Sequence, residues 1–396
     1  MTAELDAPTV APVLRSLGRD RSWSPPLQFL AADDSDRDRL AGLVSAGKIT
    51  AVIDPIAEFS DELYDCRHVG SMKDGDARAA FKERFLDEAD TFGVWVFFPW
   101  SGELVRYPEM QEYRSLRTFR NRDLITASEQ RTLTEARIAV LGLSVGSNVV
   151  DQFVQVGIGG AYLIGDTDRV NPSNLNRMRT TMRHVGMAKI DVLACKISEA
   201  DPYIEQVHLA DGYRPDAEEQ LTAFRPNLIV EEVDDLVSKA RIRRWASENR
   251  TPLIMVSDIG ERSVVDIERH DQGPVRPFNG RVKEATFAKL ADGKLTAAKE
   301  RRLLVNIVGA RNLSVRMLTS VLQVGTELAG TPQLGSAASA GAAVASVAAR
   351  AIIGQETLKS GGYVLSPRRM LKLRRQSGLR ETVEAVRALR SQLRTP

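Results

Sequence analysis

A glycine-rich turn and the acid that follows it are the first residues of this sequence whose spacing suggests chemistry. Gly142, Ser144 and Gly146 lie in the segment GLSVGS, directly after the apolar run RIAVL. A turn at the carboxyl end of a strand presents backbone N–H groups and a helix N-terminus to an anion. Asp166 ends the next apolar segment, AYLIGD, 24 residues after Gly142, where nucleotide-binding sheets carry an acid that holds ribose hydroxyl groups. The pattern predicts a nucleotide as the ligand.

The same turn has two other interpretations. It spells G-x-S-x-G, the turn that exposes a nucleophilic serine in α/β-hydrolases. Such a serine needs an acid and a later histidine, but of His184, His208 and His270, the second falls within a strand pattern and the third within a charged run. The third interpretation is an NAD(P) dehydrogenase. It is weakened because Ser144 and Ser147 replace the second and third glycines of G-x-G-x-x-G.

The segments around the turn alternate between strand and helix patterns. Strand patterns lie at 137–141, 161–164, 204–209, 227–233 and 252–256, and helix patterns at 149–154, 189–199, 216–224 and 236–249. This alternation predicts parallel strands with crossover helices on both faces. We therefore expect an α/β fold with a doubly wound, mostly parallel, Rossmann-like sheet over about residues 120–270. The charged stretch 264–270 is expected to leave the sheet, and helices are expected within 296–328 and 333–358.

Composition shifts divide the chain into four expected segments. Residues 1–35, rich in Pro, Asp and Arg, are expected to be a loosely ordered N-terminus. Residues 36–118 are expected to form a small α/β domain, with a helix at 36–48 and strands at 49–53 and 93–99. Residues 119–365 form the expected nucleotide-binding domain. Residues 366–396 form a basic helical tail, for which a solvated amphipathic helix is favoured over a nucleic-acid-binding segment.

Charge and cysteine content exclude several classes of protein. The 54 Lys and Arg residues against 52 Asp and Glu give a net charge of +2, which excludes a chain that seeks polyanions through its overall charge. Two cysteines, Cys66 and Cys195, cannot build a Cys₄ or Cys₂His₂ zinc site, and their scarcity favours a reducing cytoplasm. Segment 335–354 is too weakly apolar for a convincing membrane span, so we expect a core helix and no membrane partner.

The segment D-T-D-R-V-N-P-S-N-L-N-R, residues 166–177, is the most specific pattern in the sequence. It resembles the ThiF/MoeB family of adenylating enzymes, which are related to ubiquitin-activating enzymes and have D-x-D-x-V-x-x-S-N-L-x-R at this place. The resemblance covers about residues 115–365, including P-Q-L-G-S at 332–336. It implies that Asp166, Asp168 and Asn174 face the nucleotide, although Asp168 and Asn174 are also common turn residues.

The resemblance implies roles for four further residues. Arg177 and Lys189 match the family's triphosphate-binding arginine and lysine, and Asp234 matches its Mg²⁺-binding aspartate, with Asp235 as a one-residue alternative. Each also has a structural interpretation: a surface arginine, a lysine at a helix start, and a helix N-cap. Arg122 matches an arginine that reaches the nucleotide of a dimer partner. A homodimer with shared sites is therefore expected.

Two departures from the family narrow the expected mechanism. Many members carry two C-x-x-C pairs that bind a structural zinc, and this chain has none, so no zinc is expected. Members that pass the acyl group to a cysteine carry it in the loop that corresponds to residues 258–285, where this chain has no cysteine. Cys195 lies in a helix pattern, where a buried structural thiol is the favoured interpretation. We expect direct transfer from the acyl-adenylate.

Together the resemblance implies an ATP- and Mg²⁺-dependent adenylyltransferase of the type that activates ubiquitin-like modifiers. Its substrate would be the carboxylate of a carrier-protein or peptide C-terminus, or of a small metabolite, activated as acyl-AMP with release of pyrophosphate. An NAD(P)-binding oxidoreductase and a non-catalytic nucleotide-binding scaffold stay open as alternatives. Nucleic acid is a minor hypothesis for a partner.

Overall fold

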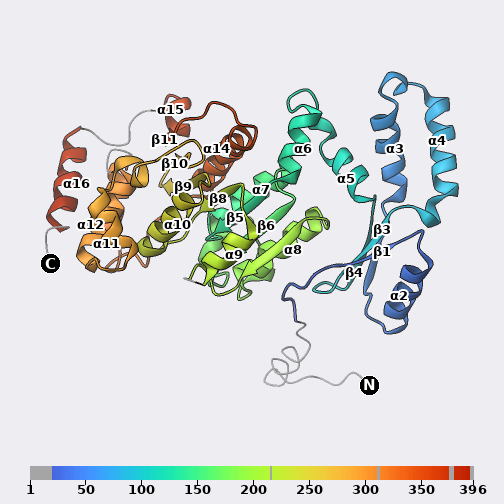
Figure 1. The fold of residues 1–396 in the computed structure, drawn as a ribbon, viewed down its shortest axis with the longest axis horizontal. Helices are drawn as coiled ribbons and strands as arrows, with labels where there is room; N and C mark the ends of the chain where they lie inside the picture. Colours follow the sequence, from blue (N-terminus) through green and yellow to red (C-terminus); the bar gives the residue numbers. More distant parts are fainter. Residues whose placement is uncertain (1–19, 215, 310–312, 374–378, 393–396) are drawn as a thin grey trace, which may run out of the picture. The chain divides into compact units, whose positions relative to one another are not determined.

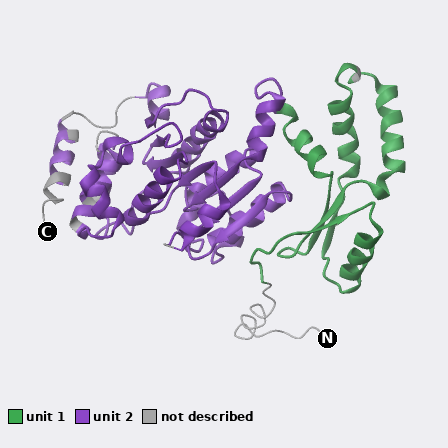
Figure 2. Ribbon diagram, in the orientation of Figure 1, with its two compact units in different colours: residues 1–120 green, residues 121–396 purple. Residues whose placement is uncertain are grey.

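The chain folds into two compact units, Met1–Arg120 and Asn121–Pro396 (Figure 2). The structure is a computed structural model that describes residues 20–214, 216–309, 313–373 and 379–392. Residues 1–19, part of the segment expected to be loosely ordered, lie outside the described residues. Each unit is described below by itself.

The first unit is a four-stranded sheet with helices. Its strands are β1 (Leu27–Leu30), β2 (Ala51–Ile53), β3 (Val94–Phe98) and β4 (Glu103–Tyr107), in the order β1-β3-β4-β2. Its helices are α2 (Asp34–Ser45), α3 (Ile56–Arg67), α4 (Gly75–Asp87) and α5 (Met110–Arg117) (Figure 1). The strand β1 corrects the expectation of a loose segment up to residue 35. It escapes a pattern search because it is short and buries only Phe29, so no alternation of apolar and polar residues marks it.

The second unit contains a seven-stranded sheet in the order β11-β10-β9-β8-β5-β6-β7. The five strands that the sequence predicts are parallel: β5 (Arg137–Leu141), β6 (Ala161–Gly165), β7 (Glu205–Leu209), β8 (Leu228–Glu231) and β9 (Leu253–Ile259). Two antiparallel strands, β10 (Arg262–Glu268) and β11 (Gly361–Leu365), complete the sheet. The predicted doubly wound, mostly parallel sheet is confirmed.

The strand β10 contradicts the prediction that the charged stretch 264–270 leaves the sheet. Seven residues of β10 pair with β9, and the acids are neutralised inside the fold. Asp266 is held by the guanidinium of Arg281, and Glu268 accepts a hydrogen bond from Arg243 at 2.7 Å. Charge argues against a buried strand only when no partner is available, and these partners lie outside the local sequence.

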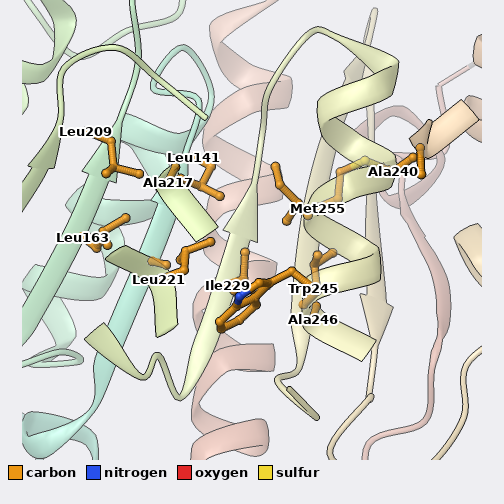
Figure 3. Packing of buried hydrophobic residues seen from close by; sticks show 14 of the residues in the cluster. Leu141, Leu163, Leu209, Ala217, Leu221, Ile229, Ala240, Trp245, Ala246 and Met255 are labelled. Atoms are coloured by element: carbon orange, nitrogen blue, oxygen red, sulfur yellow. The ribbon is translucent and has the colours of Figure 1, made fainter. Parts of the chain in front are cut away.

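Helices cover both faces of this sheet. One face packs against α9 (Ala217–Phe224) and α10 (Leu236–Glu248), whose Leu221 and Trp245 share a buried cluster with strand residues such as Ile229 (Figure 3). The other face carries α7 (Gly146–Val156), α8 (Lys189–Ala200) and α14 (Gly335–Ile353), of which α7 packs against both α8 and α14. The remaining helices of the unit are α6 (Ala127–Glu135), α11 (Glu284–Ala291), α12 (Ala297–Val308), α13 (Val315–Gln323), α15 (Pro367–Met370) and α16 (Leu379–Gln392).

Short 3-10 helices occur in both units, at Val69–Ser71, Ala89–Thr91, Phe119–Asn121, Pro172–Asn176, Met182–His184 and Pro277–Gly280.

The helix α14 is the small-residue segment that the sequence places in the core. It is long and apolar enough to pass a test for a membrane span, yet half of the tested window is buried inside the protein. Gly341 shows how closely it packs, because a Cβ added there would lie 2.4 Å from a side-chain carbon of Val256 on β9. The small residues let the helix axis approach the sheet, and this packing supports a core helix.

A buried ionic network joins β8, α10 and β10. Arg243, 1% exposed, donates to Glu231 at 2.6 Å and to Glu268 at 2.7 Å. Lys239 donates to the other oxygen of Glu231 at 2.8 Å. The guanidinium carbon of Arg243 lies 4.1 Å from the ring centroid of Phe278. Each buried carboxylate of this network therefore has a cationic partner, as burial of charge requires.

Candidate nucleotide site

The glycine turn has the strand, turn and helix arrangement that the sequence predicts. Gly142 has φ of +92°, and an added Cβ would lie 2.3 Å from the carbonyl oxygen of Glu232. Only glycine fits this position, because both the backbone conformation and the neighbouring chain exclude a side chain. Gly146 begins α7, which has no side-chain N-cap. The N–H groups of its first turn are therefore suited to an anion.

Asp166 fastens the end of β6 to the glycine turn. Its Oδ2 accepts a hydrogen bond from the Leu143 N–H at 2.7 Å, and its Oδ1 accepts one from the Asp168 N–H at 2.7 Å. The carboxylate thus lies at the carboxyl end of β6, beside the turn that follows β5. This is the place predicted for an acid that meets the ribose, although its oxygens also shape the loop.

Lys189 is the first residue of α8 and its side chain is buried. Its Nζ lies 2.7 Å from Oδ2 of Asp168 and 3.6 Å from Oδ2 of Asp166. The side chain of Asp168 is 60% exposed, so this ion pair opens toward solvent. The structure therefore brings together three of the predicted residues, Asp166, Asp168 and Lys189. The ammonium group of Lys189 lies at the edge of the site.

Arg177 reaches the glycine turn from the loop after β6. Its Nε donates to Ser144 Oγ at 3.1 Å, and its carbonyl oxygen accepts from Asn148 of α7 at 3.0 Å. A serine whose hydroxyl accepts from a guanidinium has a neighbour that cannot serve as a general base. This contact disfavours the hydrolase interpretation of the G-x-S-x-G segment.

Asn174 is buried and has a structural contact of its own. Its side-chain oxygen accepts a hydrogen bond from the Asn171 N–H at 2.9 Å, and together the two asparagines form a capping box around the short helix Pro172–Asn176. Asn174 thus shapes the loop that carries Arg177. The predicted contact of Asn174 with a nucleotide stays a prediction.

The structure separates the two adjacent acids after β8. Asp235 is the N-cap of α10, and its side chain accepts from the Ser238 N–H at 2.7 Å. Asp234 is exposed. Its negative charge contributes to the raised pKa of Asp258, so the two carboxyl groups lie close enough to repel each other. The N-cap interpretation applies to Asp235, and Asp234 stays available for a ligand.

Two acids at the end of β8 and β9 escaped the sequence analysis. Asp258, the penultimate residue of β9, is 8% exposed. Burial raises its pKa to about 6, against the opposing charge of Arg177. Glu232, whose Oε1 accepts from the Val256 N–H, has a pKa raised well above its usual value by desolvation. The rule that singled out Asp166, an acid at the carboxyl end of a parallel strand, would also have found Asp258.

The donor set fits Mg²⁺ only as the metal of a nucleotide complex. Among the described residues, no group of three or more His, Cys, Asp or Glu side chains is arranged to hold a metal ion. Mg²⁺ in nucleotide sites commonly takes one or two carboxylates, with phosphate oxygens and water as the other ligands. Asp234 matches this requirement, and the buried carboxyl oxygen Oδ2 of Asp258 has no hydrogen-bond partner among the described residues.

Arg122 is not brought to the site of its own chain. It is exposed, and the side chain of the preceding residue, Asn121, donates to the carbonyl oxygen of Val156 at the end of α7. The glycine turn lies at the opposite end of α7, whose eleven residues span about 16 Å. The contact of Arg122 with the nucleotide of a dimer partner, which the resemblance implies, stays a prediction.

The structure places three further candidates, Cys195, His208 and His270, in structural settings. Cys195 is buried in α8, and burial raises the pKa of its thiol far above the usual value, so it is a poor nucleophile. His208 lies in β7, where burial lowers its pKa to about 4. His270 is 4% exposed and lies 3.3 Å from Glu268.

Comparison with known proteins identifies the family. A model of the ThiF family matches residues 118–353. The chain is 31% identical over 310 residues to an uncharacterized protein of Mycobacterium tuberculosis (strain CDC 1551 / Oshkosh), over 78% of this chain and 41% of that protein. It is 28% identical over 149 residues to the tRNA threonylcarbamoyladenosine dehydratase of Escherichia coli (strain K12), over 36% of this chain and 55% of that enzyme.

A crystal structure of the E. coli dehydratase matches 61% of this chain and 95% of its own, with 20% identity and a TM-score of 0.44. The chain spans 41 to 59% of the length of the curated relatives it matches. The family model covers more than half of the chain and includes the glycine turn, Asp166, Arg177, Lys189 and Asp234. The chain belongs to the ThiF family.

Proposed function

We propose that this protein is an ATP- and Mg²⁺-dependent adenylyltransferase that activates a carboxylate as acyl-AMP. One observation carries the proposal. Hydrogen bonds and ion pairs join the glycine turn, Asp166, Arg177 and Lys189 at the carboxyl ends of the parallel strands β5 and β6, and Asp234 follows the neighbouring parallel strand β8. Nucleotides bind at this edge in open α/β sheets.

The chemistry follows from the charges at that edge. A carboxylate oxygen attacks the α-phosphorus of ATP, a new O–P bond forms, and the bond to the bridging oxygen breaks so that pyrophosphate leaves. Arg177 and Lys189 would neutralise the triphosphate, and the N–H groups at Gly142 to Gly146 would hold its oxygens. Mg²⁺, bound by Asp234 and the phosphates, would supply further positive charge.

A bound triphosphate would compete with Asp168 for the ammonium group of Lys189. Lys189 is held by Asp168 at 2.7 Å, and Asp168 is the exposed partner. A triphosphate would take the ammonium away from Asp168, while Asp166 stays bound to the turn through the Leu143 N–H. Asp168→Asn should therefore strengthen ATP binding, because it removes the competing charge.

The acyl group would pass directly from AMP to its acceptor. The loop 258–285 has no cysteine, and the buried thiol of Cys195 is a poor nucleophile. We place the substrate among carboxylates of a carrier protein, a peptide or a small metabolite. Because two curated relatives are tRNA threonylcarbamoyladenosine dehydratases, transfer RNA belongs in the substrate screen.

The direct test is ATP–pyrophosphate exchange. Labelled pyrophosphate should enter ATP when a cell extract or a carboxylate library supplies the substrate. Lys189→Ala and Asp234→Ala should abolish the exchange. Matched controls are Lys196→Met, which removes a lysine of the same helix that pairs with Asp151, and Asp235→Asn, which keeps the N-cap. Full exchange in both site variants would contradict the assigned roles.

A homodimer with shared sites is a second part of the proposal. Arg122 lies about one length of α7 from its own glycine turn, which is consistent with action on a partner's nucleotide. Mixing Arg122→Ala with Asp234→Ala subunits should restore part of the exchange activity, because one of the two sites in each mixed dimer is intact. Verified mixed dimers without activity would rule out the shared site.

Calorimetry separates this proposal from the two alternatives. An NAD(P)-binding oxidoreductase would bind NAD(H) saturably and would not bind ATP. A non-catalytic scaffold would bind ATP but form no AMP. The proposal requires ATP binding that depends on Lys189, together with AMP formation when the substrate is present.

A further inference from the structure

Asp258 is a buried acid that has no role in the adenylation reaction proposed above. Its Oδ1 accepts a hydrogen bond from Gln333 Nε2 at 3.1 Å, whereas its Oδ2 is buried and has no hydrogen-bond partner in the part of the chain that the structure describes. A buried carboxyl oxygen without a partner costs about 1 to 3 kcal/mol or more. Such a group is expected to have a use that offsets this cost.

The position of Asp258 is fixed by the fold. Alternate residues of β9 face the same side, so Asp258 shares its face with Val256, which packs under Gly341 of α14. Val140 of β5 points toward α7, because a Cβ added at Gly146 in the first turn of α7 would lie 3.0 Å from a side-chain carbon of Val140. Asp258 therefore lies on the face that carries α7, at the same edge as the nucleotide site.

Gln333 connects this acid to the loop of Arg177. Gln333 donates to Asp258, and its own carbonyl oxygen accepts from Asn176 at 2.8 Å. Gly335 packs so closely on this loop that an added Cβ would lie 2.5 Å from the Asn176 carbonyl oxygen. The acid is thus held in place by a segment about 75 residues away in the chain.

The charges around Asp258 favour a cation as its missing partner. The positive charge of Arg177 lowers the pKa of Asp258, while the negative charge of Asp234 raises it. When a triphosphate draws Arg177 toward its oxygens, Asp258 loses that positive charge and keeps the acid beside it. A carboxylate substrate approaching them would meet repulsion unless a cation is present.

We propose that Asp258 is a second acidic residue for the nucleotide's Mg²⁺, acting with Asp234. In the sheet order β9-β8-β5, the glycine turn follows β5, Asp234 follows β8, and Asp258 lies at the end of β9. A metal held by both acids would therefore lie toward the β9 side of the glycine turn. This inference rests on the proposed function, because the metal arrives with ATP.

The test measures metal binding directly. Mg²⁺ is titrated calorimetrically into protein saturated with α,β-methylene-ATP, which cannot form acyl-AMP, and Mn²⁺ binding is followed by electron paramagnetic resonance. Asp258→Asn should weaken the metal affinity about 10- to 100-fold, the range typical of lost supporting carboxylates. Binding of the metal-free analogue should be unchanged or tighter. Asp235→Asn is the matched control, with an expected change below about twofold.

The amide of Asp258→Asn can still accept from Gln333, so the variant should fold, and a thermal melt verifies it. If it does not fold, Asp258→Ser serves as the second variant with the same expected loss. A folded variant that binds the metal as tightly as the wild-type protein overturns the inference. This holds even if the KM for a carboxylate substrate changes in that variant. If the wild-type protein binds no ATP analogue, the proposed function fails as well. If it binds the analogue equally well with and without metal, only the Mg²⁺ role and this inference fail.

Discussion

Removal of Arg243 should destabilise the second unit more than any change on the surface of α10. Arg243→Met keeps much of the side-chain volume but deletes both hydrogen bonds to carboxylates, at 2.6 Å to Glu231 and 2.7 Å to Glu268, and the one to the Lys239 carbonyl oxygen at 3.1 Å. Glu231 retains Lys239, whereas Glu268 loses its arginine partner. Breaking a buried pair costs about 3 to 5 kcal/mol. Loss of the guanidinium over Phe278, at 4.1 Å, adds about 1 to 2 kcal/mol.

The pH dependence of this loss has a defined sign. Although burial alone would raise the pKa of Glu268, the charge of Arg243 and its contact with His270 hold it below the usual 4.5. A lowered folded-state pKa contributes stability above pH 4.5 that is lost as the pH falls through the folded value. Without Arg243 this contribution disappears. The stability difference between wild type and variant should therefore be largest near pH 7 and shrink below pH 4.5.

The measurement is equilibrium unfolding in urea, read by hydrogen exchange of peptides from β8 and β10 so that the second unit is followed separately. Arg244→Met is the matched control, because Arg244 is 42% exposed in its 3.4 Å pair with Asp292, and such pairs contribute at most about 1 kcal/mol. Glu268→Gln in the Arg243→Met background should recover about 2 kcal/mol by removing the orphaned charge. Equal losses for Arg243→Met and Arg244→Met would refute the reasoning.

Three further predictions concern single positions. Gly142→Ala should cost several kcal/mol and abolish nucleotide binding, because its Cβ would lie 2.3 Å from the Glu232 carbonyl oxygen. Thermal melts of both variants check this: Gly186→Ala, also at positive φ but with nothing within 4 Å of an added Cβ, should lose only about 1 to 2 kcal/mol of stability. Equal losses of stability in the two variants would refute the steric argument. Maleimide at pH 8 should modify Cys66 faster than the buried Cys195, as mass spectrometry of digests would show; the reverse order would contradict the assigned burial. Asp258→Asn should stabilise the metal-free protein at pH 8 by about 3 kcal/mol, since a folded pKa of about 6 against the usual 3.8 makes ionisation costly. This gain should be complete above pH 6 and vanish below pH 3.8; a gain that is independent of pH would show that Asp258 is not the titrating group.

Local sequence determined the elements of the nucleotide edge. The apolar runs of β5, β6, β8 and β9 predict parallel strands because such strands are buried on both faces. The glycine turn predicts its own conformation, since Gly142 has a positive φ that other residues rarely adopt. Asp166 could be found from its place at the end of a strand, whereas Arg177 and Lys189 could be found only through the resemblance to the ThiF/MoeB family.

Only the tertiary structure decided which acids serve the fold and which face the site. Asp235 and not Asp234 caps α10, a choice set by the backbone angles at the first turn of the helix. The place of Asp258 at a strand end was visible in the sequence, but its burial and its contact with Gln333, which is distant in sequence, were not. The strand β10 was misjudged for the same reason, since burial of Asp266 and Glu268 depends on Arg281 and Arg243. A sequence shows a charge, but the free energy of burying that charge depends on partners that only folding brings into contact.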